Sequence, residues 1–172
     1  TARLAVSLKE VEFTANGRAT STTPVAFTNL TAKKISEVND GRDLPYLMQM
    51  TPGVITTSDA GNGIGYTSMR VRGSDGSRIN VTANGIPVND PESHNVYWVN
   101  MPDLASSVRD VQIQRGVGLS TNGAGAFGAS VNMATSVPSS DPYTAIDASY
   151  GSYNSYKATL RLGTGLLHDH WS

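Results

Sequence analysis

Residues 78–88 read RINVTANGIPV, in which Asn84 and Gly85 separate two runs of alternating apolar and polar residues. Asn-Gly is the strongest short signal for a β-hairpin, because both central residues of the tight turn need a positive φ. Asparagine and glycine accept that conformation more readily than other residues. The stretch therefore predicts two antiparallel strands near the middle of the chain.

Short strands and helices are predicted on both sides of this hairpin. Thr31 is a plausible N-cap for a helix over residues 32–38, and Asp43 for a second one in which Leu44, Leu47 and Met48 share a face. Alternating or apolar runs predict further strands at residues 25–28, 54–57, 69–73, 108–114 and 130–135. Long loops lie between them. We expect a mixed α/β domain with a small central sheet, short helices and long loops.

The pattern changes after residues 136–142, which contain two prolines and three serines and are typical of a linker. In residues 143–162 apolar side chains alternate with polar ones that include Lys157 and Arg161, in two strands joined by a tight turn. Such strands are typical of a transmembrane β-hairpin with lipid on one side and water on the other. A soluble amphipathic hairpin has the same pattern.

Composition excludes several classes of protein. The 172 residues include 13 Lys+Arg against 14 Asp+Glu and no cysteine, for a formal net charge of -1. A nucleic-acid partner is not expected at that charge, nor is a disulfide framework or cysteine-bound zinc. Gly, Ser, Thr and Asn make up 65 of the 172 residues. No apolar run approaches the roughly 20 residues of a membrane-spanning helix.

Four motifs occur in order between Asp43 and Thr135: DLPYLMQMTPGV at 43–54, MRVRG at 69–73, NGIPV at 84–88, and QRGV at 114–117 with GAFGASVNMAT at 125–135. Together they resemble the plug domain of bacterial TonB-dependent outer-membrane receptors. The chain departs from the usual family pattern at Asn84, where the family commonly has Asp, at Val117 for Pro, and at Ala129 for the second Gly of its closing motif.

The resemblance implies a plug followed by the start of an antiparallel transmembrane β-barrel. Its implied divisions are a flexible leader at 1–23, the plug at 24–135, a linker at 136–142 and the first barrel strands at 143–172. Barrels of about 22 strands need some 220 residues of strand, so we expect the plug and first strands of a longer receptor. The implied partners are the remainder of its own barrel and outer-membrane lipid.

The function implied by the resemblance is gating of the barrel lumen in an outer-membrane active transporter. Such a transporter binds a scarce nutrient, for example an iron-siderophore, haem or cobalamin, and is driven by TonB and the proton motive force. The chain lacks the Tyr-Val-Val-Asp-Gly signature of starch-utilisation-type glycan importers. The alternative from a different class is a soluble secreted β-rich binding or adhesion domain.

The leader carries a short apolar-acidic run, LKEVEFTA at 8–15. It resembles a Glu-Val-Val-Val-Thr-Ala segment at or beside the TonB box of Bacteroidetes members. This implies a strand, facing the periplasm, that adds to a sheet edge of the TonB C-terminal domain. An ordinary plug strand is the alternative. The residues implied to bind TonB are Leu8, Glu10, Val11, Glu12, Phe13 and Thr14.

Two arginines lie within the family motifs, Arg72 and Arg115. The resemblance implies that each pairs with a carboxylate of the barrel beyond Ser172 and so locks the plug to the wall. The planar guanidinium suits this role because it binds a carboxylate through two parallel hydrogen bonds. The alternative is an exposed arginine on a strand.

Two loops are implied by the resemblance to face the substrate, residues 59–66 and 89–98. Asp90, Glu92 and His94 place two carboxylates and an imidazole within five residues, but a lone histidine among acids in a solvated loop is seldom a metal site. We therefore expect no metal. The candidate substrate-facing residues are Asp59, Asn62 and Tyr66 in the first loop and Asn89, Asp90, His94, Tyr97 and Trp98 in the second. For the aromatic residues Tyr66, Tyr97 and Trp98, packing within the loop is the alternative.

Residues 123–128 spell the dinucleotide fingerprint G-x-G-x-x-G. The fingerprint acts at the N-terminus of a helix, whereas residues 130–135 predict a strand, so no nucleotide cofactor is expected. No nucleophile, base and orienting group lie together in the sequence. We expect no enzyme.

Overall fold

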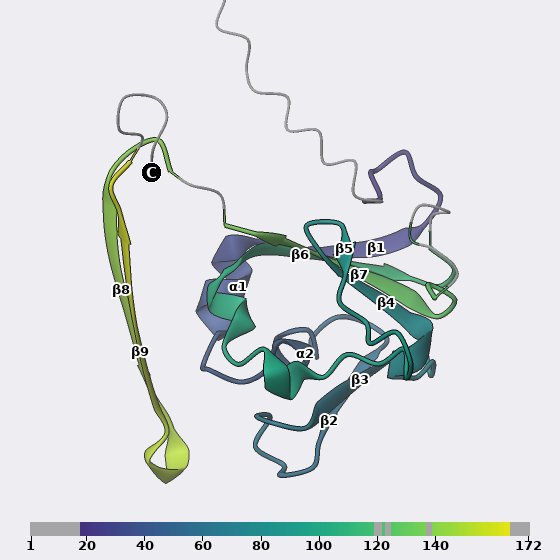
Figure 1. The fold of residues 1–172 in the computed structure, drawn as a ribbon, viewed down its shortest axis with the longest axis horizontal. Coiled ribbons are helices and arrows are strands. Elements are labelled where there is room, and N and C mark those ends of the chain that lie inside the picture. The colour runs from purple at the N-terminus through teal and green to yellow at the C-terminus, as the bar shows by residue number, and fades with distance from the viewer. Residues whose placement is uncertain (1–17, 119–121, 123–124, 137–138, 166–172) are drawn as a thin grey trace, which may run out of the picture.

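A five-stranded sheet forms the centre of the fold (Figure 1). The computed structural model describes residues 18–118, 122, 125–136 and 139–165. In this part of the chain β4 runs parallel to β7, and the other neighbouring strands of the sheet are antiparallel. In spatial order the strands are β1 (Ala26–Leu30), β6 (Val108–Arg115), β7 (Ala129–Thr135), β4 (Ile79–Ala83) and β5 (Ile86–Pro87).

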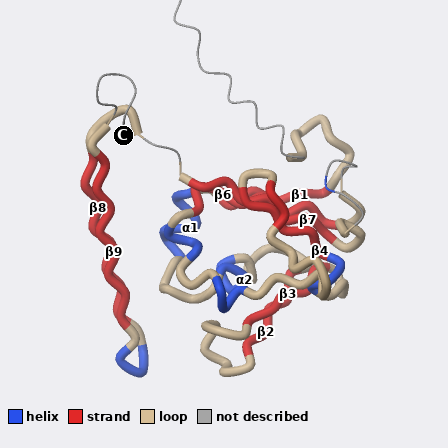
Figure 2. The backbone as a smooth tube through the Cα atoms, in the orientation of Figure 1, coloured by secondary structure: helices blue, strands red, loops and turns tan. Residues whose placement is uncertain are grey.

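Two hairpins stand outside this sheet, as Figure 2 shows. One consists of β2 (Val54–Ser58) and β3 (Thr67–Val71), the other of β8 (Tyr143–Tyr150) and β9 (Tyr156–Gly163). None of the described helices is long and apolar enough to cross a membrane. The helices are α1 (Ala32–Val38) and α2 (Leu44–Leu47), with 3-10 turns η1 (Gly76–Arg78), η2 (Trp98–Asn100), η3 (Leu104–Ser106) and η5 (Ser152–Asn154).

The predicted Asn-Gly hairpin is confirmed. Asn84 and Gly85 have φ values of 50° and 83° between β4 and β5. The Asn84 side chain also donates to the Thr135 hydroxyl at 2.8 Å and accepts from the Thr135 backbone N–H at 3.0 Å. An ionised aspartate could only accept, so its bond with the Thr135 hydroxyl would run in the opposite direction. Through these two bonds the Asn84 amide ties the turn to the end of β7.

The two helices begin where the sequence predicts, but only one cap forms as expected. The Thr31 hydroxyl accepts from the Lys34 N–H at 3.5 Å, as an N-cap should. Asp43 occupies the N-cap position of α2, yet its side chain makes no cap bond. Its carboxylate instead accepts from the Thr67 hydroxyl at 2.8 Å. Asp43 is therefore the N-cap residue of α2 as predicted, but it makes no side-chain cap bond because the start of β3 takes its carboxylate.

One face of the sheet is apolar and carries the core. Pleating sends alternate side chains to opposite faces, so this face collects every second residue of β4, β6 and β7. Helix α1 contributes Ile35 to the same cluster, and α2 with its C-cap contributes Leu44, Leu47 and Met48. The buried sheet residues are Ile79, Val81, Val111, Ile113, Ala129, Val131 and Met133.

The opposite face of the sheet is polar and also buried. Gln112 and Gln114 are 3% and 0% exposed, and Asn80, Thr82, Ser130 and Asn132 beside them are buried too. The Thr82 hydroxyl donates to Asn132 Oδ1 at 2.8 Å. Arg18 and Ala19 attach to this buried polar face.

Candidate functional site

The β8–β9 hairpin has two chemically different faces. Its register places Tyr150 opposite Tyr156 and Ile146 opposite Leu160 on one face. The other face carries polar pairs, among them Ser149 opposite Lys157 and Asp147 opposite Thr159. The large apolar side chains are each at least 62% exposed, namely Ile146, Tyr150, Tyr156, Leu160 and Leu162.

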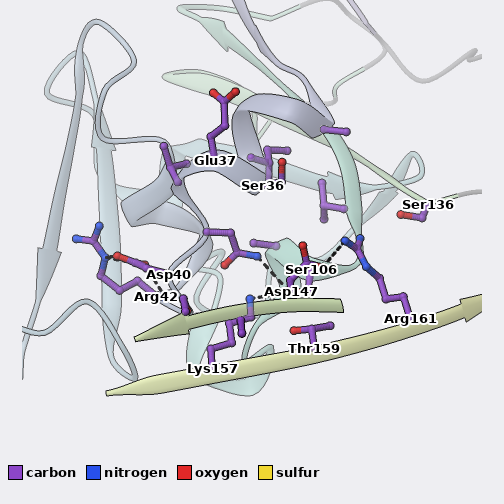
Figure 3. Close-up of a pocket in the computed structure, with 18 of the residues that line it drawn as sticks. Ser36, Glu37, Asp40, Arg42, Ser106, Ser136, Asp147, Lys157, Thr159 and Arg161 are labelled. Carbon is purple, nitrogen blue, oxygen red and sulfur yellow. Dashed lines mark hydrogen bonds and ion pairs between the residues drawn. The ribbon is translucent and has the colours of Figure 1, made fainter. Parts of the chain in front are cut away.

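The polar face of the hairpin lies toward the α/β domain across a cavity of about 770 Å³ (Figure 3). On the domain side the cavity is lined by α1, the loop that follows it, and η3. Its charged groups are paired: Asp147 with Arg161 at 2.6 Å within the hairpin, and Asp40 with Arg42 at 2.8 Å in the loop. The cavity is therefore a gap between two polar surfaces whose charged side chains are paired.

One side chain crosses this gap. Lys157 Nζ lies 2.6 Å from Asp103 Oδ1 and 2.7 Å from Ser106 Oγ, so β9 is bonded directly to the segment before β6. The Lys157 side chain is 15% exposed. A lysine ammonium that has lost most of its water needs such partners, because desolvation of an unpaired charge is costly.

Arg72 and Arg115 are brought together at the far end of β6. Arg72 has a φ of 50°, and its N–H donates to the Gly53 carbonyl at 2.8 Å while its guanidinium donates to the Arg115 carbonyl at 3.5 Å. The Arg115 guanidinium donates to the Thr28 hydroxyl at 2.8 Å. Neither arginine forms an ion pair with an acidic side chain in the described part of the chain. The two cationic side chains therefore lie close together, and some of their guanidinium N–H groups remain available for a further partner.

The first predicted loop is exposed at its tip. Asp59, Asn62 and Tyr66 are all exposed, and Tyr66 retains 68% of its surface. The loop is fastened at Gly63, whose carbonyl accepts from the Asp43 N–H at 2.9 Å. The structure therefore leaves these three predicted residues free to meet a ligand.

The second loop is held by its own polar side chains. Asn89 accepts from the Val81 N–H at 2.7 Å and donates to the carbonyls of Ile79 and His94, both at 2.8 Å. Its amide thereby prolongs the β4 ladder and closes the loop. These three bonds give Asn89 a structural role in the loop, and its substrate-facing role stays a prediction.

Asp90 also stabilises the loop through local hydrogen bonds. Its carboxylate accepts from the Ser93 N–H at 2.7 Å and from the Ser93 hydroxyl at 2.9 Å. These bonds, the backbone one first, hold the pKa of Asp90 below its ordinary value. His94 and Tyr97 are exposed, and His94 has a φ of 58°. Among the described residues no three His, Asp or Glu side chains gather as a metal site.

Trp98 is not a substrate-facing residue. It is 3% exposed and belongs to the core cluster, where it begins η2. Together with Met69 and Val81 it lines a small pocket. The prediction is wrong because a polar loop of this length needs an apolar anchor, and Trp98 is the side chain that turns inward.

The contact between Ala19 and Gln112 could not be anticipated from the sequence. The Gln112 Oε1 accepts from the Ala19 N–H at 2.6 Å, and its Nε2 donates to the Ala19 carbonyl at 2.9 Å and to Asn29 Oδ1 at 2.8 Å. Arg18 beside it forms an ion pair with Asp110. One feature of the sequence indicates only that Gln112 is placed for a contact of this kind: Gln112 and Gln114 alternate with apolar residues in β6, so they share the face opposite the core. The predicted TonB-binding residues 8–14 lie outside the described residues.

Comparisons with known proteins agree with one another. The family model described as TonB-dependent Receptor Plug Domain matches residues 19–130. A curated relative, the metal-pseudopaline receptor CntO of Pseudomonas aeruginosa, is 38% identical over 74 residues, which are 43% of this chain and 10% of that protein. The chain thus matches about a tenth of the length of this relative.

Solved structures share the fold at low identity. The ferric yersiniabactin uptake receptor FyuA from Yersinia pestis matches 84% of this chain and 22% of its own, with 20% identity and a TM-score of 0.63. The structure of the FpvAI–pyocin S2 complex matches 86% of this chain and 19% of its own, with 20% identity and a TM-score of 0.66. The mixed α/β fold expected from the sequence is confirmed by these likenesses.

Proposed function

This chain belongs to the TonB-dependent receptor plug domain family, and from that premise we propose that it closes the lumen of an outer-membrane active transporter. Members of the family are outer-membrane receptors for nutrient uptake. The observation that carries the proposal is the β8–β9 hairpin, which follows the plug, turns its polar face toward it and exposes an apolar face on the other side. That is the arrangement required at a wall between lipid and a hydrated lumen.

We assign residues 24–135 to the plug, 136–142 to a linker, and 143–172 to the first barrel strands. Residues 1–23 form the leader, and the segment 8–14 pairs with the TonB C-terminal domain in the periplasm. TonB then transmits the proton motive force to the plug. The Gln112 contact with Ala19 supports this assignment, because it attaches the described end of the leader to a defined point on β6. A pull on the leader is thereby delivered to the central sheet.

The nutrient is a metal chelate in this proposal. CntO, whose name describes a metal–pseudopaline receptor, is the curated relative, and FyuA is described as a ferric yersiniabactin receptor. Iron-siderophores, haem and cobalamin all fall within that class. The exposed Asp59, Asn62, Tyr66, His94 and Tyr97 are the plug residues that would contact the chelate. The likeness of the leader to Bacteroidetes members stays a proposal, since CntO and FyuA come from Pseudomonas and Yersinia.

A soluble secreted binding or adhesion domain is not favoured. The family match covers residues 19–130, and the exposed apolar side chains of β8 and β9 form a continuous row. Such a row on a soluble protein needs a partner to cover it.

We propose that Arg72 and Arg115 lock the plug to carboxylates of the barrel. Replacing either by alanine in the full-length receptor removes charge-assisted bonds worth roughly 1.5–3 kcal/mol, so the plug should loosen. The expected result is about a tenfold or larger rise in pore leakage in single-channel recordings. Arg70→Ala is the matched control, because Arg70 is an exposed arginine of β3 only two residues before Arg72. Leakage unchanged from wild type in both Arg72→Ala and Arg115→Ala would contradict the locking role.

A further inference from the structure

Lys157 contacts the plug through both its aliphatic stem and its ammonium group, unlike an exposed surface ion pair. Its aliphatic stem packs over Gly41, where a Cβ atom would lie 3.4 Å from Lys157 Cδ. Gly41 has a φ of 94°, which suits glycine. The ammonium then reaches both Asp103 and Ser106. Stem and charge are therefore both engaged by the plug.

Ser106 completes the network. Its hydroxyl donates to Asp103 Oδ1 at 2.9 Å and accepts from Asn39 Nδ2 at 3.1 Å and from Lys157 Nζ at 2.7 Å. A hydroxyl has one hydrogen and two lone pairs, so these three bonds use its full capacity. The network thus joins the end of α1, the turn η3 and strand β9 at one point.

Its location differs from that of the arginine pair. Asp103 and Ser106 lie just before β6 begins at Val108, whereas Arg115 ends that strand. Seven residue steps of roughly 3.4 Å separate the two ends by about 24 Å. Figure 1 shows α1 on the side of the central sheet that faces the hairpin, and Figure 3 shows Lys157 beneath Ser106.

A neighbouring cation on the same face of β9 behaves differently. Arg161 is bonded to Asp147 of the same hairpin, and its side chain is 42% exposed, compared with 15% for Lys157. Its ion pair holds β8 to β9 and does not reach the plug. Position on the polar face is therefore not enough to fasten the plug, and the contact is specific to Lys157.

We propose that Lys157 is a plug-to-wall fastening that holds the α1–η3 side of the plug against β9, at the opposite end of β6 from Arg72 and Arg115. The inference rests on the proposed function, in which the hairpin is part of the wall. With two fastenings at opposite ends of one strand, release at the arginine end leaves the plug attached at Lys157. The plug would then turn about the Lys157 end instead of leaving the barrel as a free body.

The test is hydrogen exchange on the full-length receptor in detergent or bilayer. Lys157→Met keeps most of the stem and removes the ammonium, so amides of residues 104–107 should exchange about tenfold faster than in the wild type. Arg161→Met, the matched control, should leave that segment unchanged. The paired reversal Lys157→Asp with Asp103→Lys should restore at least part of the lost protection, because it rebuilds an opposite-charge pair.

Wild-type exchange of residues 104–107 in Lys157→Met would overturn the proposal. If Lys157→Met accelerates exchange in β4 and β7 as well, the paired reversal distinguishes a lost fastening from general destabilisation. Recovery of protection at residues 104–107 in the paired reversal supports the fastening, and no recovery rejects it. Failure of the proposed function can be told apart from failure of this inference. It would appear as access of water to the apolar face of the hairpin, whatever the rate of amide hydrogen exchange at η3.

Discussion

A receptor that carries Val11→Pro is expected to bind its nutrient with unchanged affinity and to import none of it by the energised route. Val11 stands in the middle of the proposed TonB-binding strand at residues 8–14. Strand addition depends on a ladder of backbone hydrogen bonds, and proline removes one donor and cannot occupy a paired strand interior. Uptake of the radiolabelled metal chelate should fall to the level of a strain without TonB.

The control for this variant is Ala2→Pro, which places the same residue in the leader outside the proposed strand. It should import at the wild-type rate. Binding of the chelate to isolated outer membranes checks that Val11→Pro is folded and inserted. Normal uptake by Val11→Pro would remove the assignment of residues 8–14 and leave the alternative that they form an ordinary plug strand.

Trp98→Ala is expected to be the most destabilising single change in the plug. The side chain is 3% exposed within the core, and truncation of a buried tryptophan costs about 3–5 kcal/mol. Whole domains have only roughly 5–15 kcal/mol of stability. Amides of β4 and β7 in the full-length receptor should therefore exchange about a hundredfold or more faster than in the wild type.

Tyr97→Ala provides the neighbouring comparison, because Tyr97 is 46% exposed and lies outside the core cluster. It should change core exchange by less than about threefold, as is usual for surface substitutions. A Trp98→Ala receptor whose core exchanges like that of Tyr97→Ala would mean that Trp98 is not the anchor of its loop.

The local elements of the fold could be predicted because their causes lie within a few residues. The Asn84-Gly85 turn follows from the φ requirement of a two-residue hairpin, and the Thr31 cap from one hydroxyl and one nearby N–H. The alternation in β8 and β9 fixes which side chains share a face, since side chains in a strand have a period of two. Strand β3 ends at Val71, earlier than predicted, because Arg72 and Gly73 take positive φ.

The functional residues were harder to assign because their roles depend on partners far away in the sequence. Gln112 is hydrogen-bonded to Ala19, which lies 93 residues earlier, and Lys157 to Asp103, 54 residues earlier. Trp98 belongs to a polar loop by composition, and only the packing of the loop base turns it inward. The proximity of Arg72 to Arg115 did not follow from the sequence, because the two arginines are 43 residues apart, and their described surroundings supply no acidic partner.

The measurement that bears most directly on the central claim is the solvent exposure of the two hairpin faces in the full-length receptor in a bilayer. This part of the receptor contains no cysteine, so single nitroxide labels can be placed at Ala148 and Ala158 on one face and at Ser149 and Thr159 on the other. If the hairpin begins the barrel wall, the alanine sites should be accessible to oxygen dissolved in lipid and shielded from a water-soluble relaxation agent, and the polar sites should not show that lipid signature. Equal access of the water-soluble agent to all four sites would contradict the account.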